Sequence, residues 1–368
     1  MRGLEKIGFG LFALGCTPNA TGQAPVPVIS KYGQLVVFDA GTFTQVEPRA
    51  PKAIYQGGDK LAYLSDGNDL KLYADHRLTV LERGETVEMA VSRHLLAWRS
   101  GPALRIPAAD GGASTICRSV GRFAVGDSII VFDDLMQQQI GVHWKGRTFP
   151  VADIMPGGEV PWKTGSNTLL LYDLDRRRVL LFYRGTLSTL CNGTDMSRSE
   201  PGGDVVAFLD EYDDIFRIFD RGEEYEVEPF APTDFQVGEG LVAWVNSTGA
   251  FRCYQGGQIW DLMDYAPDAF WVRDSLVVFR DVNRFKVFCK GAVETLDQQM
   301  PSQWAVSGAG IAWLDGQQRL NLFREGERSM VSREPGIRNF GIHPSVVVYQ
   351  SNSGEYKVWW NGKLYSHY

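Results

Sequence analysis

The sequence has few of the residues from which catalytic and metal sites are commonly built. Five His and five Cys occur in 368 residues, and no two His have the spacing of a metal-binding pair. It also lacks a Gly-x-Ser-x-Gly elbow, a Walker-type loop and a Gly-x-Gly-x-x-Gly turn. We therefore predict no catalytic residue, no metal and no cofactor. The remaining enzymatic alternative is a hydrolase whose catalytic carboxylates come together from distant positions in the sequence.

An excess of basic residues is missing as well. The formal net charge is −7, and Arg176–Arg178 is the only basic run. Nucleic-acid binding needs clustered Lys and Arg, so no nucleic-acid partner is expected. Ser65–Asp69 superficially resembles a calcium loop but lacks the distal Glu, and we interpret it as a turn between strands. No stretch approaches 18 consecutive apolar residues, so the sequence predicts no membrane-spanning helix.

What the sequence does contain is a repeated phrase of four apolar residues, usually ending in an aromatic residue. From the second copy on, it recurs with a period of about 35 residues, which is typical of one supersecondary unit stacked on itself. The ten copies are Leu35–Phe38, Leu61–Leu64, Leu95–Trp98, Ile129–Phe132, Leu169–Tyr172, Val205–Phe208, Leu241–Trp244, Leu276–Phe279, Gly310–Trp313 and Val346–Tyr349.

Each unit contains four short runs rich in Val, Ile, Phe, Tyr and Trp, separated by turn residues. Turns such as those at Gly126 and Gly238 are expected to use glycine for unusual backbone angles. Four antiparallel strands repeated in tandem predict an all-β fold, a β-propeller of four-stranded blades. The prominent Trp98, Trp244 and Trp313 are then expected to pack between blades. A constant period argues against a β-sandwich.

The expected count is nine full blades from Ala53 onward, within a range of eight to ten. Residues 27–48 hold further strands at Val28–Lys31, Leu35–Phe38 and Phe43–Val46. These strands form either a reduced tenth blade or a part of the last blade that closes the ring, since an open ring would leave unpaired edges. Two smaller propellers, divided near the longer Pro150–Ser166 connection, are the alternative.

The cysteines beyond Cys16 do not form a disulfide framework. Cys117 and Cys191 fall two blades apart, too far for a disulfide. Cys253 and Cys289 lie on third strands of neighbouring blades, one position out of phase. We expect four buried free thiols, with a Cys253–Cys289 bond as the less favoured alternative.

The N-terminus has a charged start, a short apolar stretch and then Ala13-Leu14-Gly15-Cys16. This arrangement resembles a bacterial lipoprotein signal peptide. The resemblance implies removal of residues 1–15 and attachment of lipid to Cys16, which would hold the protein on a membrane. Residues 16–27 would then be a flexible tether and residues 28–368 the propeller domain. A plain secretory signal and an ordinary cytosolic N-terminus are the alternatives.

Two further resemblances bear on location and blade type. Some lipoproteins of the Bacteroidota carry acidic residues after the lipidated Cys as a surface-export signal, whereas Thr17-Pro18-Asn19-Ala20 follows Cys16 here. That comparison implies the periplasmic side of the outer membrane rather than the cell surface. Leu61-Ala-Tyr-Leu-Ser-Asp66 is loosely similar to the degenerate blades of TolB-type propellers, a likeness of blade and not of function.

A rigid repeat, a tether and no catalytic set favour a non-catalytic scaffold that binds an outer-membrane or periplasmic protein complex. Candidate partner-binding residues are Trp162, in the long connection, and Trp260 and Tyr265. The alternative is a propeller that binds a glycan or small ligand, in which Trp260 and Tyr265 would stack on sugar rings.

Overall fold

The computed structural model describes residues 24–58, 60–84, 88–108, 111–155, 159–193, 195–308 and 310–367. The predicted signal peptide, the lipid attachment residue Cys16 and most of the tether lie outside these residues. The last part of the expected tether is buried, because Val26 is already the first residue of a strand and has no exposed surface.

Every regular element in the described residues is a β-strand, and the strands form ten antiparallel sheets in chain order, which we number as blades 1 to 10. Blade 1 has three strands: β1 (Val26–Ile29), β2 (Leu35–Asp39) and β3 (Thr42–Glu47). Blades 2 to 10 have four strands each: β4 (Ala53–Gln56), β5 (Leu61–Leu64), β6 (Leu70–Ala74), β7 (Arg77–Glu82); β8 (Glu88–Val91), β9 (Leu96–Ser100), β10 (Ala103–Pro107), β11 (Ala113–Cys117); β12 (Val120–Val125), β13 (Ile129–Asp134), β14 (Gln139–Trp144), β15 (Arg147–Asp153); β16 (Trp162–Thr164), β17 (Thr168–Asp173), β18 (Arg178–Tyr183), β19 (Thr186–Asn192); β20 (Ser199–Pro201), β21 (Val205–Asp210), β22 (Ile215–Asp220), β23 (Glu223–Glu228); β24 (Asp234–Val237), β25 (Leu241–Val245), β26 (Phe251–Gln255), β27 (Gln258–Met263); β28 (Ala269–Arg273), β29 (Leu276–Asp281), β30 (Arg284–Cys289), β31 (Ala292–Asp297); β32 (Trp304–Ser307), β33 (Gly310–Leu314), β34 (Leu320–Arg324), β35 (Glu327–Ser332); β36 (Asn339–His343), β37 (Val346–Gln350), β38 (Tyr356–Trp360), β39 (Lys363–His367).

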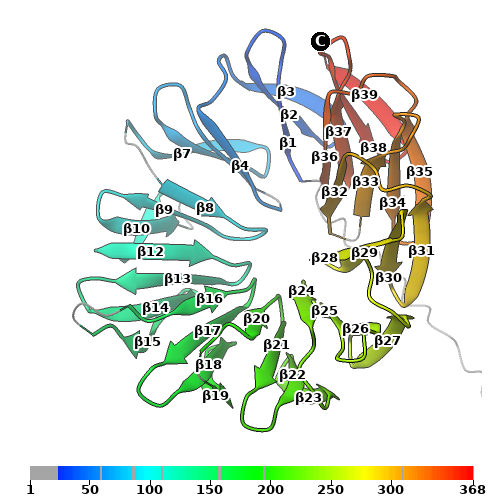
Figure 1. Cartoon of the computed structure of the whole chain (residues 1–368). Helices are drawn as coiled ribbons and strands as arrows, with labels where there is room; N and C mark the ends of the chain where they lie inside the picture. The colour runs from blue at the N-terminus through cyan, green and yellow to red at the C-terminus, as the bar shows by residue number, and fades with distance from the viewer. Residues whose placement is uncertain are drawn as a thin grey trace, which may run out of the picture.

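The blades stand radially around one ring, with the first strand of each four-stranded blade toward the centre (Figure 1). Ten clusters of buried apolar side chains fill the ten interfaces between neighbouring blades, including the interface between blades 10 and 1. The core is therefore distributed among interfaces rather than gathered in one centre. The propeller and its nine full blades are confirmed, and the alternative of two smaller propellers is wrong.

The repeated apolar phrases form second strands because this position is buried on both faces. A second strand has a paired strand on each side and a neighbouring blade on each face, so every residue of β25 is buried, for example. Nine of the ten predicted phrases coincide with second strands, with Leu95 alone preceding its strand, β9. The exception is Leu35–Phe38, which lies in β2 and corresponds to a third strand; the phrase in register is Val26–Ile29.

Blade 1 lacks the innermost strand. Residues 26–47 match residues 61–82 of blade 2 position by position, with the same strand lengths and the same connections. The connections agree in detail: Ser30 N donates to Gln34 O as Ser65 N donates to Asp69 O. The register also shifts after Leu35 as it does after Leu70. Residues 27–48 therefore form a reduced tenth blade of second, third and fourth strands, and they do not complete blade 10.

Two prolines stand on the unpaired edge of β1. Ser30 bonds to Gln34, which directly precedes β2, and bonded pairs alternate along an antiparallel ladder, so the backbones of Pro25 and Pro27 face the other side. Proline has no N–H to offer a further strand. The inner edge of blade 1 is thus protected against adding a foreign strand, and Pro25 O instead accepts a hydrogen bond from Gln56 Nε2 at 2.8 Å.

In the inner turns, which we define as the connections between first and second strands, the predicted unusual backbone angles occur at Gly240 (φ 151°) and Gly308 (φ 59°), whereas other glycines serve a different purpose. Gly126 and Gly238 do not have positive φ. A Cβ added to Gly126 would stand 2.4 Å from the Ser166 carbonyl oxygen of the next blade, and one added to Gly165 would stand 1.8 Å from that of Gly202. Glycine is required there because neighbouring blades approach closely, and not because of an unusual backbone angle.

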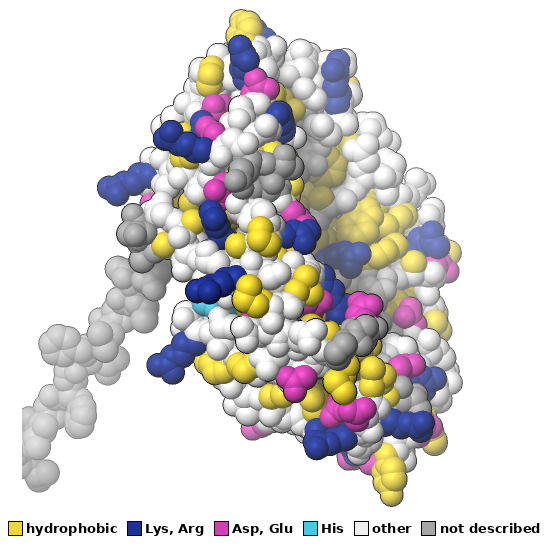
Figure 2. Space-filling view, turned by 90° about the vertical axis from the view of Figure 1, so that its left-hand side faces the viewer, with side chains coloured by type: hydrophobic (Ala, Val, Ile, Leu, Met, Phe, Trp, Pro, Cys, Tyr) yellow, Lys and Arg dark blue, Asp and Glu magenta, His cyan; other side chains and the backbone are white. Residues whose placement is uncertain are grey.

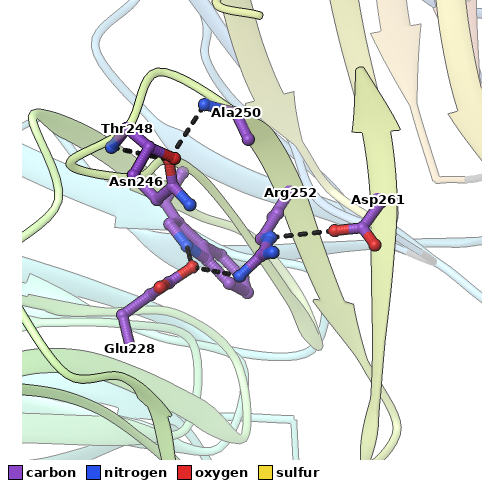
Figure 3. A network of polar contacts seen from close by, with 7 residues as sticks. Glu228, Asn246, Thr248, Ala250, Arg252 and Asp261 are labelled. Atoms are coloured by element: carbon purple, nitrogen blue, oxygen red, sulfur yellow. Dashed lines mark hydrogen bonds and ion pairs between the residues drawn. The ribbon is translucent and has the colours of Figure 1, made fainter. Parts of the chain in front are cut away.

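A three-residue interblade bridge recurs at three interfaces. A Glu at the end of the fourth strand accepts hydrogen bonds from an aromatic residue in the second strand and a cation in the third strand of the next blade. Figure 3 shows the bridge between blades 6 and 7, where Glu228 Oε1 lies 2.9 Å from Trp244 Nε1 and 2.8 Å from an Arg252 terminal nitrogen. The other two bridges are Glu47 with Tyr63 and Lys71, and Glu82 with Trp98 and Arg105.

The four described cysteines are free and buried, as expected, and Cys253 and Cys289 are not bonded to each other. Burial raises the pKa of the Cys117 thiol to about 11 and that of Cys191 to about 12. Thiols with such values are protonated at neutral pH and behave as small apolar side chains.

Candidate functional site

The meander inside each blade gives the ring two chemically distinct faces. Because successive strands are antiparallel, the second-to-third-strand turns and the connections between blades lie on one face, which we call the upper face. The inner turns and the third-to-fourth-strand turns lie on the opposite, lower face. Any surface built from several blades therefore combines residues about 35 positions apart in the sequence.

Exposed apolar side chains gather on the upper face. Nine large hydrophobic residues in the described part of the chain are more than half exposed, and all nine lie in upper-face connections. Eight of them belong to the consecutive blades 4 to 8 and to the connections that follow blades 4, 6 and 7; we call these eight the apolar arc. The arc comprises Leu135, Met136, Met155, Leu174, Tyr212, Phe230, Tyr265 and Val282, and Tyr32 stands apart on blade 1.

The outer edge of the ring has a different character. The remaining large hydrophobics that are exposed in the described residues all lie in fourth strands and are less than half exposed. Figure 2 shows the side of the ring formed by the blades on the left of Figure 1, where positive and negative side chains are interspersed and hydrophobic side chains lie between them. Such a mixed surface is typical of ordinary solvent-facing strands.

Hydrogen bonds within the turns fix the backbone that carries two of the exposed residues of the apolar arc. Asp210 Oδ1 accepts the backbone N–H of Tyr212 at 3.1 Å, and the other carboxylate oxygen of Asp210 lies 2.7 Å from an Arg217 terminal nitrogen. In blade 4, Asp134 Oδ1 accepts the backbone N–H of Met136 at 3.0 Å. Side chains that bind the backbone two residues later hold a turn in one shape. The exposed tips are therefore presented by ordered turns.

Of the three predicted partner-binding residues, only Tyr265 belongs to the arc. Tyr265 Oη donates to Asp281 at 2.9 Å, and this hydrogen bond to a carboxylate raises the pKa of the phenol. Trp162 is partly buried: its indole nitrogen binds Asp133 at 2.9 Å, and the Arg122 guanidinium lies 4.6 Å from the ring centroid. Their binding role stays a prediction.

Trp260, the third predicted residue, packs across an interface. Its ring lies 6.0 Å from that of Phe288, and it covers Gly291 so closely that an added Cβ there would be 2.8 Å away. Trp144 covers Gly185 in the same way, and Trp360 covers Gly41 across the junction of the first and last blades. These tryptophans fill spaces beside third-to-fourth-strand turns.

On the lower face, hydrogen bonds link the inner turns of blades 2 to 9. Successive backbone links include Gly58 N to Arg93 O at 2.9 Å and Glu239 N to Asp274 O at 2.7 Å. Side chains complete the series, as where Asp127 Oδ1 accepts from Arg93 N at 2.9 Å. Two pockets of about 330 and 400 Å³ lie among these turns, and neither has Phe, Tyr or Trp among its lining residues.

Glu239 is the inner-turn acid whose pKa is shifted. Burial raises it, the nearby Asp127 raises it further, and a hydrogen bond from Ser166 Oγ opposes the change. The carboxylate thus joins turns two blades apart. No group of three or more potential metal ligands occurs among the described residues. Nor does that part of the chain contain a helix long and apolar enough to cross a membrane.

The sequence analysis missed seven of the eight arc residues. A signal was present: Leu174, Tyr212 and Val282 each follow, by one or two positions, an Asp that ends an apolar second strand. That signal could not show that the tips share one face until the strand directions were known.

Comparisons with known proteins agree on the fold. The family model described as the 10-bladed beta propeller domain matches residues 19–365. No curated protein matches the chain. Among solved structures, the CRINKLY WD40 ectodomain of the Arabidopsis thaliana receptor kinase ACR4 is 9% identical, with 65% of this chain and 93% of that chain covered and a TM-score of 0.34.

Two other solved structures show similarly distant likeness. The computationally designed Ika8 protein is 13% identical, covers 84% of this chain and 96% of its own, and has a TM-score of 0.33. PorZ, a surface component of the type-IX secretion system of Porphyromonas gingivalis, is 8% identical, covers 94% of this chain and 58% of its own, and has a TM-score of 0.29. Likeness at this level concerns the fold alone.

Proposed function

The chain belongs to the 10-bladed β-propeller family, and from that premise we propose that it is a non-catalytic scaffold that binds another cell-envelope protein through the apolar arc. The propeller supports a binding role in general, because its faces are wide and are built from turns that the blades hold rigidly. The more specific proposal, that the partner binds the upper face, depends on the apolar arc.

The observation that carries the proposal is the one-sided distribution of exposed apolar side chains. Solvent-exposed hydrophobic residues scattered singly need no explanation, but a series along one face of five consecutive blades is typical of an interaction surface. Tyr212, the most exposed of the eight at 86%, and Phe230 are of the aromatic type enriched at interface centres. Ordered turns lower the entropy lost on binding.

A site-specific crosslinking experiment tests this choice of face. A photo-crosslinking amino acid is placed at position 212 or 282 in the arc and, as the matched control, at position 364, where Leu364 is an exposed apolar residue of a fourth strand. In cells that express the protein natively, we expect one discrete adduct from positions 212 and 282 and none from position 364. Equal adducts from all three positions, or none from the arc, would contradict the proposal.

Binding energy should follow the same distribution. The double variant Tyr212→Ser/Val282→Ser should lose the crosslinked partner in co-purification, whereas Leu78→Ser, on an outer strand, should retain it. Both variants change only exposed residues, so their thermal stability should stay near that of the wild type. A partner retained equally by both variants would place the interface elsewhere.

The lipid anchor is a separate part of the proposal. Cys16, in Leu14-Gly15-Cys16, would carry the lipid and hold the scaffold at the periplasmic side of the outer membrane. Metabolic labelling with a palmitate analogue should label the wild type but not Cys16→Ser, which should leave the membrane fraction. Absence of label from the wild-type protein would contradict the lipid anchor, but it would not bear on the apolar arc as a binding surface.

A further inference from the structure

The interface between blades 8 and 9 retains the tryptophan of the interblade bridge but has lost its two partners. Trp313 occupies the position of Trp98 and Trp244, and its side chain is buried, with the residue only 3% exposed. Asp297 stands sixteen residues earlier, where the bridged interfaces have Glu, and Asn321 pairs with Trp313 on the adjacent strand, where they have Lys or Arg. Trp313 Nε1 has no hydrogen-bond partner.

The missing side chains leave a space of matching chemistry. A pocket of about 440 Å³ lies between these blades, and Asp297, Trp313 and Asn321 are among its lining residues, with Arg319 and Arg328. Asp is one methylene shorter than Glu, and Asn is far shorter than Arg. The pocket therefore occupies the region that a carboxylate and a cation fill in the bridged interfaces.

The local carboxylates are already engaged elsewhere. Asp297 Oδ1 accepts the backbone N–H of Gln299 at 3.3 Å within its own turn, and it makes no bond to the indole. Asp315 Oδ2 lies 2.7 Å from Arg319 Nε, which leaves the terminal guanidinium nitrogens of Arg319 without a protein partner in the described residues. Arg328 contributes a second guanidinium, which lies 3.6 Å from Glu294 Oε2 and binds the Leu296 carbonyl oxygen at 3.4 Å.

We propose that this pocket binds a carboxylate from outside the chain, seated where Glu47, Glu82 and Glu228 place theirs. A buried N–H without an acceptor is costly, and a charged acceptor would satisfy it. The Trp313 indole and the Arg319 guanidinium donate to the ligand. Because Trp313 Nε1 is out of contact with solvent before binding, the side chains that cover it must move when the ligand enters.

Asp297 sets the strength of the site and supplies its matched variants. Its negative charge opposes a second carboxylate nearby, so Asp297→Asn should bind the ligand several-fold more tightly. Asp297→Glu restores the residue found in the bridged interfaces and should occupy the site from within, so that external carboxylate no longer binds. Opposite effects from two conservative changes at one position would identify the site.

The indole N–H resonances of ¹⁵N-tryptophan-labelled protein report binding directly. The probes are N-acetylglutamate amide, its neutral isostere N-acetylglutamine amide, and acetate. With N-acetylglutamate amide, we expect the Trp313 resonance, assigned with Trp313→Phe, to move saturably. The resonances of Trp98 and Trp244, which already bind a carboxylate, should stay in place. The Asp297→Glu variant should show no movement, and its thermal unfolding verifies that it is folded.

Each other result also decides the matter. Equal binding of the neutral amide, or an unchanged response in Asp297→Glu, would overturn the carboxylate site, as would a static Trp313 resonance in both the wild type and Asp297→Asn. Binding of acetate as well as the glutamate probe would identify any small carboxylate as sufficient. Binding of the glutamate probe alone would identify the acidic side chain of a polypeptide as the ligand. The outcome is independent of the crosslinks from the apolar arc.

Discussion

Two interfaces, one between blades 6 and 7 and the other between blades 8 and 9, have the same fold and a buried tryptophan at the same position. Only the first provides an acceptor for the indole N–H. Trp244 donates to Glu228, whereas Trp313 has no acceptor although Asp297 stands at the corresponding position. The repeat places the tryptophan, while the length of the acidic side chain on the preceding blade decides whether its N–H is bonded. A repeat protein can thus open a site at one interface without disturbing the others.

Removal of the carboxylate from the intact bridge between blades 6 and 7 should have the largest effect on stability. Glu228→Ala leaves the Trp244 indole without an acceptor, whereas the partly exposed Arg252 keeps its ion pair with Asp261, and should destabilise the protein by about 3 kcal/mol. Urea unfolding measures the loss. Glu226→Ala, on the same strand but exposed, is the control and should cost less than about 1 kcal/mol. Similar losses in both variants would show that the bridge has no special weight.

The next interface, between blades 9 and 10, contains a histidine that should make stability depend on pH. His343, in the first strand of blade 10, lines a pocket with Arg93 and Asp274, and its carbonyl oxygen accepts from Arg324 of blade 9. Burial lowers the pKa of the imidazole from 6.5 to about 4. The unfolded chain therefore binds more protons than the folded protein between these values.

Stability should consequently fall as the pH drops from 7 to 4, by roughly 3 kcal/mol from this residue. Urea unfolding across that range should show a flatter profile for His343→Gln than for the wild type. His94→Gln, at an exposed position, should leave the profile unchanged. A wild-type slope that persists in His343→Gln would assign the acid sensitivity to other groups.

A matched pair of substitutions isolates the indole N–H. Trp244→Phe and Trp313→Phe remove similar volume at corresponding positions. Trp244→Phe also deprives the buried Glu228 carboxylate of a hydrogen bond, whereas Trp313→Phe removes a donor that has no partner. We expect Trp244→Phe to be less stable than Trp313→Phe by about 2 kcal/mol. Equal free energies of unfolding would mean that Trp313 Nε1 is not effectively unpaired in solution.

The smallest expected effect is the repair of the open interface. Asp297→Glu with Asn321→Arg rebuilds the bridge around Trp313 and should raise stability by about 1 kcal/mol, since a partly buried ion pair adds little beyond the satisfied N–H. The melting temperature measures it, and Asn321→Arg alone is the control because it adds the cation without the acceptor. A lower melting temperature for the double variant would show that the pocket cannot take the bridge.

Much of the architecture could be predicted because it depends on local pattern. The apolar phrases identified second strands at nine positions, and the expected buried thiols were found. The error at Leu35–Phe38 arose because a third strand can be as apolar as a second one, and β2 is buried at every residue. The fixed spacing from Val26 to Glu47, repeated from Leu61 to Glu82, contained the correct register.

The candidate surfaces were much harder to predict. Tyr265 was singled out, whereas Tyr212 and Val282 looked like ordinary turn residues until strand direction placed them on one face. The need for glycine at position 165 could not be seen in the sequence either, because the Gly202 carbonyl oxygen that requires it belongs to the next blade, 37 residues later. The same two turns are also joined by a hydrogen bond from Asn167 to Asp204. The pocket beside Trp313 depends on residues from two blades.

The period, the strands and the number of full blades follow from the sequence, because alternation, turn residues and repeat spacing act over a few neighbouring positions. Tertiary structure alone decided the closure of blade 1 against blade 10, the one-sided arc and the unpartnered Trp313 indole. Each of these depends on distances between side chains of different blades, and such distances are set only when the whole ring is assembled.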